Sequence, residues 1–257
     1  MPGSGAAERQ PTDTSSAYWG ESAARYEFAL QYVQPDTVAL DVACGTGYGL
    51  RLISGRGARP FGVDLDPEAA RSAISQDPDR RSVVLRGNGC RLPFRDATFS
   101  VVTSFETIEH LHTRSELVAE LRRVLRPGGV LVLSTPNAIH TRPVNGKPDN
   151  PFHVHEYTPT ELRQELSASF GDVQLLGQIL DGRFRIPPYW LDQQRLPRTP
   201  GAQLGLLSRK VMNRLPQGLR DQLSQILWGH TFYPRSGDYH FDAAGIDRAA
   251  NLVAVCR

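Results

Sequence analysis

The pattern of apolar positions alternates between short continuous runs and segments with helical spacing. Continuous apolar runs predict strands at residues 37–42, 60–64, 83–86, 99–104 and 130–134. Between these runs, apolar side chains recur every three or four positions, as in a helix with one buried face. Strands that are apolar throughout and alternate with helices are typical of a parallel sheet with helices on both faces. The first half of the chain therefore predicts a doubly wound α/β fold.

The pattern changes after the fifth predicted strand. Residues 135–157 contain four prolines and show no periodicity, which is typical of a functional or mobile loop. The sequence TPTE at residues 158–161 then predicts a helix with a capping box, which runs to about residue 169. Further strands are predicted at residues 172–180 and 251–256. The complete prediction is a Rossmann-like sheet of seven mainly parallel strands.

Two segments fall outside this alternation. Residues 1–14 are rich in Gly, Ser, Pro and Thr and predict a disordered tail. Residues 182–248 carry two helical patterns before the last strand, so we interpret them as an insertion within a single domain of residues 15–257. Aromatic residues here and in the first helix suit a lid over an acceptor; a dimer interface or ordinary packing suits them too. These residues are Tyr18, Trp19, Tyr189, Trp190, Trp228, Phe232 and Tyr233.

Composition and charge narrow the class of protein. The 257 residues carry a formal net charge of +2, which gives no electrostatic footprint for nucleic acid or a membrane surface. Three widely spaced cysteines favour a reducing compartment over a disulfide framework, and none has a close partner of the kind found in zinc sites. Because the sequence has no apolar signal segment and no run long enough to span a membrane, we expect a cytoplasmic protein.

A glycine-rich sequence follows the first predicted strand. Residues 40–49 read LDVACGTGYG, where Gly45 and Gly47 let the backbone approach a ligand that a β-carbon would exclude. A dinucleotide fold requires G-x-G-x-x-G to seat a pyrophosphate at a helix N-terminus, whereas the spacing here is G-x-G-x-G. The preceding acid, Asp41, suits a ligand with an ammonium and a sulfonium better than a pyrophosphate. Asp64, at the end of the second strand, is placed to accept hydrogen bonds from a ribose.

These residues resemble motif I of class I S-adenosylmethionine-dependent methyltransferases. The resemblance continues in order through LPF at 92–94, FETIEHL at 105–111 and LRPGG at 125–129, as in the type 11 methyltransferase family. It covers about half of the chain. The segments RYEFA at 25–29 and NPFHVHEY at 150–157 are also similar to a subgroup associated with polysaccharide, deoxysugar and natural-product pathways.

The resemblance implies S-adenosylmethionine as the cofactor and S-adenosylhomocysteine as its product. It implies that residues 41–47 hold the methionine moiety, Asp64 the ribose, and Asn88 with Gly89 the adenine, while Glu106 faces the methionine portion or the acceptor. Asn88 stands where the family usually carries Asp, and its amide oxygen can still accept a hydrogen bond from the adenine amine. The implied cofactor-binding residues are Asp41, Ala43, Gly45, Gly47, Asp64, Leu65, Asn88, Gly89, Phe105 and Glu106.

A general base would separate hydroxyl from amine methylation. An aliphatic hydroxyl must lose its proton to a base, whereas an amine needs only to arrive neutral. His110 follows the fourth predicted strand at the ligand end of the sheet and is the first candidate base, with capping or loop anchoring as its alternative role. His153 and His155, in the loop after the fifth strand, are candidates for a base or an acceptor contact. We predict no metal site, because the H-x-H-E sequence at 153–156 has no clear third partner.

We therefore expect a methyltransferase that acts on a small molecule, with a sugar or secondary-metabolite hydroxyl as the first choice of acceptor. Methylation of an amine-bearing metabolite is the alternative within this class. A cyclase or regulatory protein that binds the cofactor without transferring methyl is the alternative outside it. An NAD-dependent dehydrogenase is disfavoured by the glycine spacing and by the absence of a Tyr-x-x-x-Lys pair. We expect no nucleic-acid or membrane partner, and a homodimer is compatible with the sequence.

Overall fold

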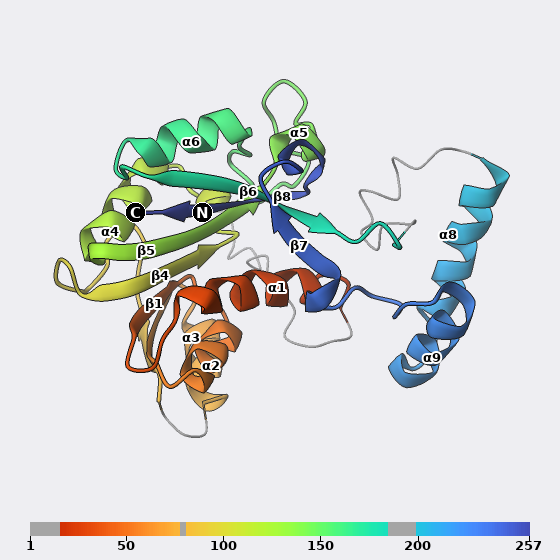
Figure 1. The fold of residues 1–257 in the computed structure, drawn as a ribbon, viewed down its shortest axis with the longest axis horizontal. Helices are drawn as coiled ribbons and strands as arrows, with labels where there is room; N and C mark the ends of the chain where they lie inside the picture. The colour runs from red at the N-terminus through yellow and green to blue at the C-terminus, as the bar shows by residue number, and fades with distance from the viewer. Residues whose placement is uncertain (1–15, 78–80, 185–198) are drawn as a thin grey trace, which may run out of the picture. The chain divides into compact units, whose positions relative to one another are not determined.

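Eight strands form one sheet in the part of the chain that the structure describes, residues 16–77, 81–184 and 199–257 (Figure 1). The structure is a computed structural model, and its strand order is β3-β2-β1-β4-β5-β8-β6-β7. Strands β1 to β5 are parallel, whereas β8 is antiparallel to both β5 and β6. The strands are β1 (Val38–Val42), β2 (Arg59–Asp64), β3 (Val83–Arg86), β4 (Phe99–Phe105), β5 (Leu125–Pro136), β6 (Val173–Leu180), β7 (Tyr239–Asp242) and β8 (Asn251–Cys256).

This sheet confirms the predicted doubly wound, mainly parallel fold and adds one strand to the seven expected. The additional strand, β7, lies inside the stretch interpreted as a helical insertion. Its four residues, YHFD, are too few to show an apolar pattern. Strand β5 also begins earlier than predicted. Leu125 pairs with Phe99 and Val130 pairs with Val101, so the strand continues through the predicted turn with a shift in register.

Helices cover both faces of the sheet. Helices α1, α2 and α3 lie on one face, and α4 and α6 lie on the other (Figure 1). The predicted capping box opens α6, where the Glu161 amide donates to the Thr158 hydroxyl and the Thr158 amide donates to the Glu161 carboxylate. The helices of these layers are α1 (Trp19–Ala29), α2 (Tyr48–Gly55), α3 (Pro67–Ser75), α4 (Arg114–Val124) and α6 (Pro159–Ser167), with a short α5 (Ala138–Thr141) after β5.

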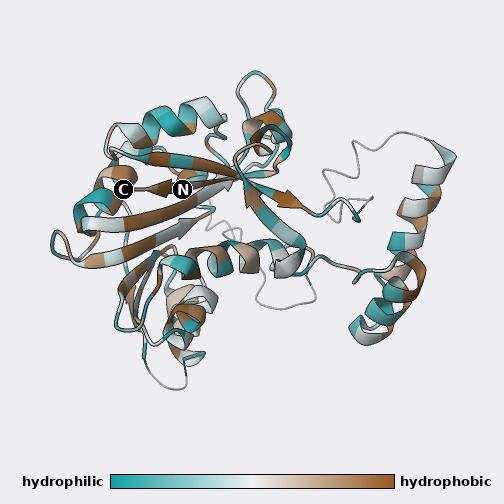
Figure 2. Ribbon diagram, viewed as in Figure 1, coloured by the Kyte–Doolittle hydropathy of each residue, from teal (hydrophilic) through white to brown (hydrophobic). Residues whose placement is uncertain are grey.

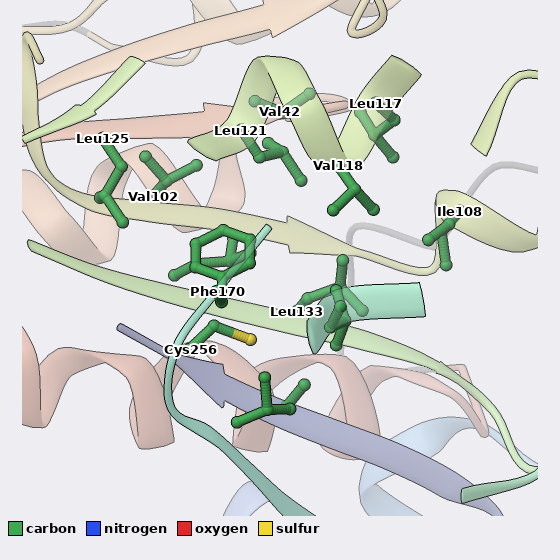
Figure 3. Packing of buried hydrophobic residues seen from close by; sticks show 14 of the residues in the cluster. Val42, Val102, Ile108, Leu117, Val118, Leu121, Leu125, Leu133, Phe170 and Cys256 are labelled. Atoms are coloured by element: carbon green, nitrogen blue, oxygen red, sulfur yellow. The ribbon is translucent and has the colours of Figure 1, made fainter. Parts of the chain in front are cut away.

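The largest hydrophobic core lies between the sheet and the layer of α4 and α6 (Figure 3). Leu117 and Leu121 of α4, Leu133 of β5, Phe170 and Cys256 are all buried in it. The central strands are apolar along much of their length, while α6 is mostly polar (Figure 2). Burial on both faces fixes the strands, so the loops at their carboxyl ends begin from rigid positions.

The chain divides into two compact units. Among the described residues, the smaller unit contains 16–24, 180–184 and 199–240, and the larger unit contains the others. Helices α8 (Pro200–Met212) and α9 (Gln217–Trp228) belong to the smaller unit. Within it, the Arg220 guanidinium lies over the rings of Tyr233 at 4.6 Å and Phe232 at 4.9 Å. These predicted lid aromatics therefore pack inside their own unit.

Several predictions about the periphery stay open. The tail of residues 1–14, and the aromatic pair Tyr189 and Trp190, lie outside the described residues. A lid or dimer role for residues 182–248 remains a prediction. In the described ranges, no helix is both long enough and apolar enough to cross a bilayer.

Candidate active site

The glycine loop connects the carboxyl end of β1 to the start of α2. Its backbone is left-handed at Ala43 (φ +62°), Gly45 (φ +53°) and Gly47 (φ +83°). A β-carbon at Gly47 would lie 2.8 Å from that of Ala73, so glycine is required there for packing as well as for conformation. A β-carbon at Gly45 would meet no heavy atom within 4 Å. The loop thus presents bare backbone at the sheet edge where α/β proteins bind ligands.

The third glycine of the run, Gly49, makes room for an aromatic ring of the chain itself. A β-carbon at Gly49 would overlap Cε1 of Tyr26. The Tyr26 ring also packs edge-on against Tyr48 and Phe105, with ring centroids 5.8 Å and 4.9 Å apart. Gly49 therefore serves the packing of α1 against the loop, which explains a G-x-G-x-G spacing without a pyrophosphate.

Asp41 is a fully buried carboxyl group in β1. Its Oδ1 accepts a hydrogen bond from the Thr103 hydroxyl at 2.7 Å, and its Oδ2 accepts one from the Tyr26 hydroxyl at 3.0 Å. Burial raises the pKa of Asp41 to about 7; Asp64 adds to this shift and the two hydroxyls oppose it. A cation placed nearby would favour the ionised form of this carboxyl group.

Asp64, at the end of β2, ties that strand to the glycine loop. Its Oδ2 accepts from the amide of Gly45 at 2.8 Å, and its Oδ1 accepts from the amide of Asp66 at 2.9 Å. Leu65, between the two acids, is 65% exposed, so its side chain points to solvent rather than into the core. Each carboxylate oxygen has a second lone pair, so Asp64 can hold the loop and still accept hydrogen bonds from a ribose.

Asn88 and Gly89 follow β3. Oδ1 of Asn88 accepts a hydrogen bond from the amide of Cys90 at 2.9 Å, so this side chain shapes its own turn. A β-carbon at Gly89 would lie 3.0 Å from Cγ1 of Val42 and 3.1 Å from Cδ1 of Leu117. Asn88 keeps its amide hydrogens and a second lone pair on Oδ1 for a ligand.

Glu106 follows Phe105 directly after β4 and has a left-handed backbone with a φ of +48°. Its Oε1 accepts a hydrogen bond from the Ser134 hydroxyl at 2.6 Å and lies 3.8 Å from the guanidinium of Arg25. Arg25 is buried and also donates to Oε1 of Gln178 at 3.0 Å. A left-handed residue other than glycine is uncommon, and such residues concentrate at functional sites.

His110 ends the 3₁₀ turn η2 (Ile108–His110) that follows β4. Its Nδ1 lies 3.0 Å from the carbonyl oxygen of Phe152. A carbonyl only accepts, so Nδ1 must be the donor, and in the neutral ring Nε2 then carries the lone pair. Nε2 lies 3.9 Å from Oε1 of Glu109, and the His110 side chain is 30% exposed.

Glu109 is a buried carboxyl group, and one of its two oxygens has no hydrogen-bond partner among the described residues. It is 0% exposed; its Oε2 accepts from the Thr135 hydroxyl at 3.0 Å, and its Oε1 has no hydrogen-bond partner among the described residues. Its backbone carbonyl accepts from the amides of Val154 and His155, which pins the loop after β5 onto η2. Burial and the neighbouring Glu106 raise the pKa of Glu109 well above its usual range.

His153 lies beside His110. The two imidazole rings pack edge-on with centroids 4.9 Å apart. Nδ1 of His153 lies 2.7 Å from Oε1 of Glu156, and its Nε2 lies 3.0 Å from the side-chain nitrogen of Asn150. Since an amide nitrogen only donates, Nε2 is the acceptor and Nδ1 carries the hydrogen that faces the carboxylate.

The structure brings His110 and His153 together but not His155, whose ring packs edge-on against Tyr157 at 4.6 Å. Sequence reasoning missed the residues that hold the predicted ones in place: Arg25, Tyr26, Thr103, Glu109 and Ser134. Thr103 and Ser134 are polar positions within apolar strands, and that interruption is a signal that could have found them. Arg25 and Tyr26 belong to the RYEFA segment noted for its resemblance, but the sequence does not indicate their partners, Gln178 and Asp41.

The fold and the loop together define a class of protein. A doubly wound sheet with an antiparallel last strand, a glycine loop after β1 and an acid at the end of β2 is the arrangement expected for class I methyltransferases. The [4+2]-cyclase SpnF has a similar fold, with a TM-score of 0.56 and 16% identity over 95% of this chain and 85% of that one. At this level of identity the likeness concerns the fold alone.

Residues 40–133 match the family described as "Methyltransferase domain". A probable S-adenosylmethionine-dependent methyltransferase of Mycolicibacterium smegmatis is 39% identical over 135 residues, 52% of each chain. Another protein so described, from Mycobacterium tuberculosis, is 38% identical over 172 residues, which are 65% of this chain and 61% of that one. The resemblance to S-adenosylmethionine-dependent methyltransferases is thereby confirmed, whereas that of residues 25–29 and 150–157 to the sugar and natural-product subgroup stays a prediction. The chain matches between half and two thirds of the length of these relatives.

Proposed function

We propose that the protein transfers a methyl group from S-adenosylmethionine to a hydroxyl group of a small molecule, such as a sugar or a secondary metabolite. S-adenosylmethionine supplies a methyl group on a positively charged sulfur. The family match of residues 40–133 and the open backbone at Gly45 support this donor. Acceptor identity beyond the hydroxyl class rests on the resemblance of residues 150–157 to enzymes of sugar and natural-product pathways.

The chain's own residues suit a cationic nucleoside ligand. Asp64 would accept the ribose hydroxyls through its second lone pairs, and Asn88 with Gly89 would border the adenine. Asp41 and Glu106 add negative charge at the ends of β1 and β4, which complements the ammonium and sulfonium charges. Rigid strand ends hold these groups in place, as an in-line displacement requires close alignment of its partners.

The observation that carries hydroxyl methylation is the orientation of the His110 ring. Its Nδ1 donates to the carbonyl of Phe152, so the Nε2 lone pair is available to accept a proton from an acceptor hydroxyl. His153 is a weaker base candidate because its Nε2 already accepts from Asn150. His155 packs against Tyr157 and is not beside the other two histidines.

The test is turnover with a labelled methyl donor. Purified protein is incubated with methyl-labelled S-adenosylmethionine and a panel of monosaccharides, phenols and primary amines, and S-adenosylhomocysteine and labelled products are quantified. The proposal expects label on an oxygen atom of at least one hydroxyl-bearing acceptor. Label on nitrogen alone would make the protein an N-methyltransferase. Tight donor binding with no transfer to any member of the panel would instead favour a cyclase or regulatory role.

A further inference from the structure

Three side chains beyond the cofactor loop converge on one point. Within the described residues, Glu109, His110 and His153 each offer one ligand atom, and these atoms all lie within 4.8 Å of one another. One is a buried carboxyl group, which would bind the ion as a carboxylate, and two are imidazoles. We propose that they form a binding site for one divalent transition-metal ion of the zinc class.

The first support is the unused oxygen of Glu109. This side chain is 0% exposed, and its Oε1 has no hydrogen-bond partner among the described residues. A buried polar atom without a partner is costly, because it has lost its hydration and gained nothing in return. Oε1 lies 3.9 Å from Nε2 of His110, so the orphaned oxygen faces a nitrogen lone pair. Two electron-pair donors that face each other need a proton or a metal ion between them.

The second support is that each proposed ligand side chain has a second polar atom, which would not bind the ion and which already has a hydrogen-bond partner. Nδ1 of His110 donates to the carbonyl of Phe152, and Nδ1 of His153 faces the Glu156 carboxylate. The ligand atom of His153 is then Nε2, which would exchange its hydrogen bond from Asn150 for the ion. Oε2 of Glu109 accepts from the Thr135 hydroxyl. Metal-ligating histidines and carboxylates almost always have such outer partners, which set the tautomer and the ring orientation.

The outer partners are themselves anchored. Glu156 is buried, and its other oxygen accepts from the Thr141 hydroxyl. The backbone carbonyl of Glu109 holds the loop after β5 in place through the amides of Val154 and His155. The supports of the proposed site therefore come from η2, the end of β5 and the loop that follows it. These supports would hold the three ligand side chains near one another in the absence of the ion.

The donor set selects the kind of ion. Two imidazoles and one carboxylate suit zinc and its neighbours, whereas magnesium and calcium prefer oxygen ligands throughout. Ligand atoms of a tetrahedral zinc ion lie about 3.3 Å apart, so the present cluster, whose atoms lie within 4.8 Å of one another, must contract by up to about 1.5 Å. The two histidines are partly exposed, at 30% and 10%, whereas Glu109 is fully buried, so the movement would fall to the imidazole rings. Three protein ligands would leave one coordination position open.

The direct test uses the metal alone, with neither methyl donor nor acceptor present. Tag-free, metal-free protein is titrated with Zn²⁺ by calorimetry, and with Co²⁺ by visible absorption. The proposal expects one equivalent of each ion, with the ligand-field bands of a low-coordinate Co²⁺ site, and a higher unfolding temperature with Zn²⁺. Absence of Zn²⁺ binding to the wild-type protein would overturn it.

Variants of the proposed ligands show whether the ion binds at this cluster or at other side chains on the surface. His110→Asn and His153→Asn are expected to abolish the Co²⁺ bands, and Glu156→Gln to weaken Zn²⁺ binding by about 10- to 100-fold. His155→Asn is the matched control, because His155 lies in the same loop outside the cluster, and it should bind like wild type. Equal loss in the control, or no loss in His110→Asn and His153→Asn, would place the ion elsewhere.

One consequence rests on the proposed function. A bound ion would occupy the Nε2 lone pair that His110 needs as a base, so added Zn²⁺ should inhibit hydroxyl methylation. If Zn²⁺ binds at one equivalent and turnover rises instead, the metal site stands and His110 is not the base. If Zn²⁺ does not bind and turnover depends on His110, the metal site fails and the proposed base stands.

Discussion

The two halves of the candidate site are built in different ways. The glycine loop, residues 43–49, is defined by its own backbone, with left-handed residues and glycines whose missing β-carbons leave room for Tyr26 and Ala73. The histidine site, His110 and His153, is defined by side chains from separate segments. The His110 ring is held by the carbonyl of Phe152, and the His153 ring by the carboxylate of Glu156. Local sequence can specify the first kind of site, whereas only tertiary folding assembles the second.

We expect the first region to bind the methyl donor and the second to determine the reaction of the acceptor. The glycine loop and Asp64 form a surface suited to a nucleoside, and its geometry is set by short-range constraints. The histidine region would choose what happens to the acceptor, because it holds the groups that can take a proton or an ion. Variants in the first region should therefore change stability and donor affinity, and variants in the second should change turnover.

The largest expected effect is on turnover. Replacing His110 by Asn removes the Nε2 lone pair, and we expect kcat with a hydroxyl acceptor to fall by about 10²- to 10⁴-fold, while donor affinity stays unchanged. Steady-state kinetics with calorimetric binding of S-adenosylhomocysteine measures both. His155→Asn serves as the control and should stay within a few-fold of wild type. Turnover of His110→Asn within a few-fold of wild type would remove His110 as the base.

A pH-dependent stability effect should come next in size. The pKa of Asp41 is raised by burial from 3.8 to about 7, so the folded protein binds this proton more tightly than the unfolded chain does. Its contribution to stability is therefore full below about pH 4 and is lost as the pH rises through 7. Relative to Asp41→Asn, the wild-type unfolding free energy should fall by about 3 kcal/mol between pH 5 and pH 8.

Urea unfolding of wild type and Asp41→Asn at several pH values measures this difference directly. Groups that titrate alike in the two proteins contribute equally to both unfolding free energies, so their contributions cancel in the difference. A difference that stays constant from pH 5 to pH 8 would show that the carboxyl group titrates normally. It would also mean that the end of β1 is more hydrated than its burial indicates.

A smaller effect is expected from the packing of one glycine. Gly49→Ala places a methyl group on the Tyr26 ring and should destabilise the fold by about 1–3 kcal/mol, since overpacking forces the ring away. Gly55→Ala, at the end of the same helix, meets nothing within 4 Å and should be neutral or slightly stabilising. Chemical denaturation of both variants checks the contrast. Equal effects would contradict the assigned contact between α1 and the loop.

The smallest effect is expected at Asn88. Asn88→Asp restores the acid that the family usually carries, and both side chains offer an oxygen that can accept from the Cys90 amide and from an adenine amine. The affinity for S-adenosylhomocysteine should stay equal or rise by at most about tenfold, since a charged acceptor makes a stronger hydrogen bond. A clear loss of affinity would mean that the amide hydrogens of Asn88, rather than its oxygen, contact the ligand.

The sheet and its loop could be predicted because their signals are local. Continuous apolar runs identified β1 to β5, and the TPTE sequence identified the start of α6 together with its hydrogen bonds. β7 could not be found, because four residues with one buried side chain carry no periodic pattern. The extension of β5 back to Leu125 was also missed, since Pro and Gly in the sequence RPGG normally indicate a turn.

The candidate site was predictable only in part, for the same physical reason. Positions such as Gly47 and Asp64 follow from strand ends and backbone geometry. Arg25 and Gln178, 153 positions apart, meet only because α1 and β6 are brought together by the whole fold. The importance of Glu109 depends on burial, and the burial of a single acid beside a partly exposed histidine cannot be predicted from the local sequence.

The central claim is that the glycine loop and Asp64 bind S-adenosylmethionine. Calorimetric titration of the purified protein with S-adenosylhomocysteine, and separately with NAD, tests it most directly. We predict binding of one equivalent of S-adenosylhomocysteine, weakened by about tenfold or more in Asp64→Ala by the loss of charged hydrogen bonds, and no binding of NAD. Binding of NAD without S-adenosylhomocysteine, or unchanged affinity in Asp64→Ala, would contradict the account.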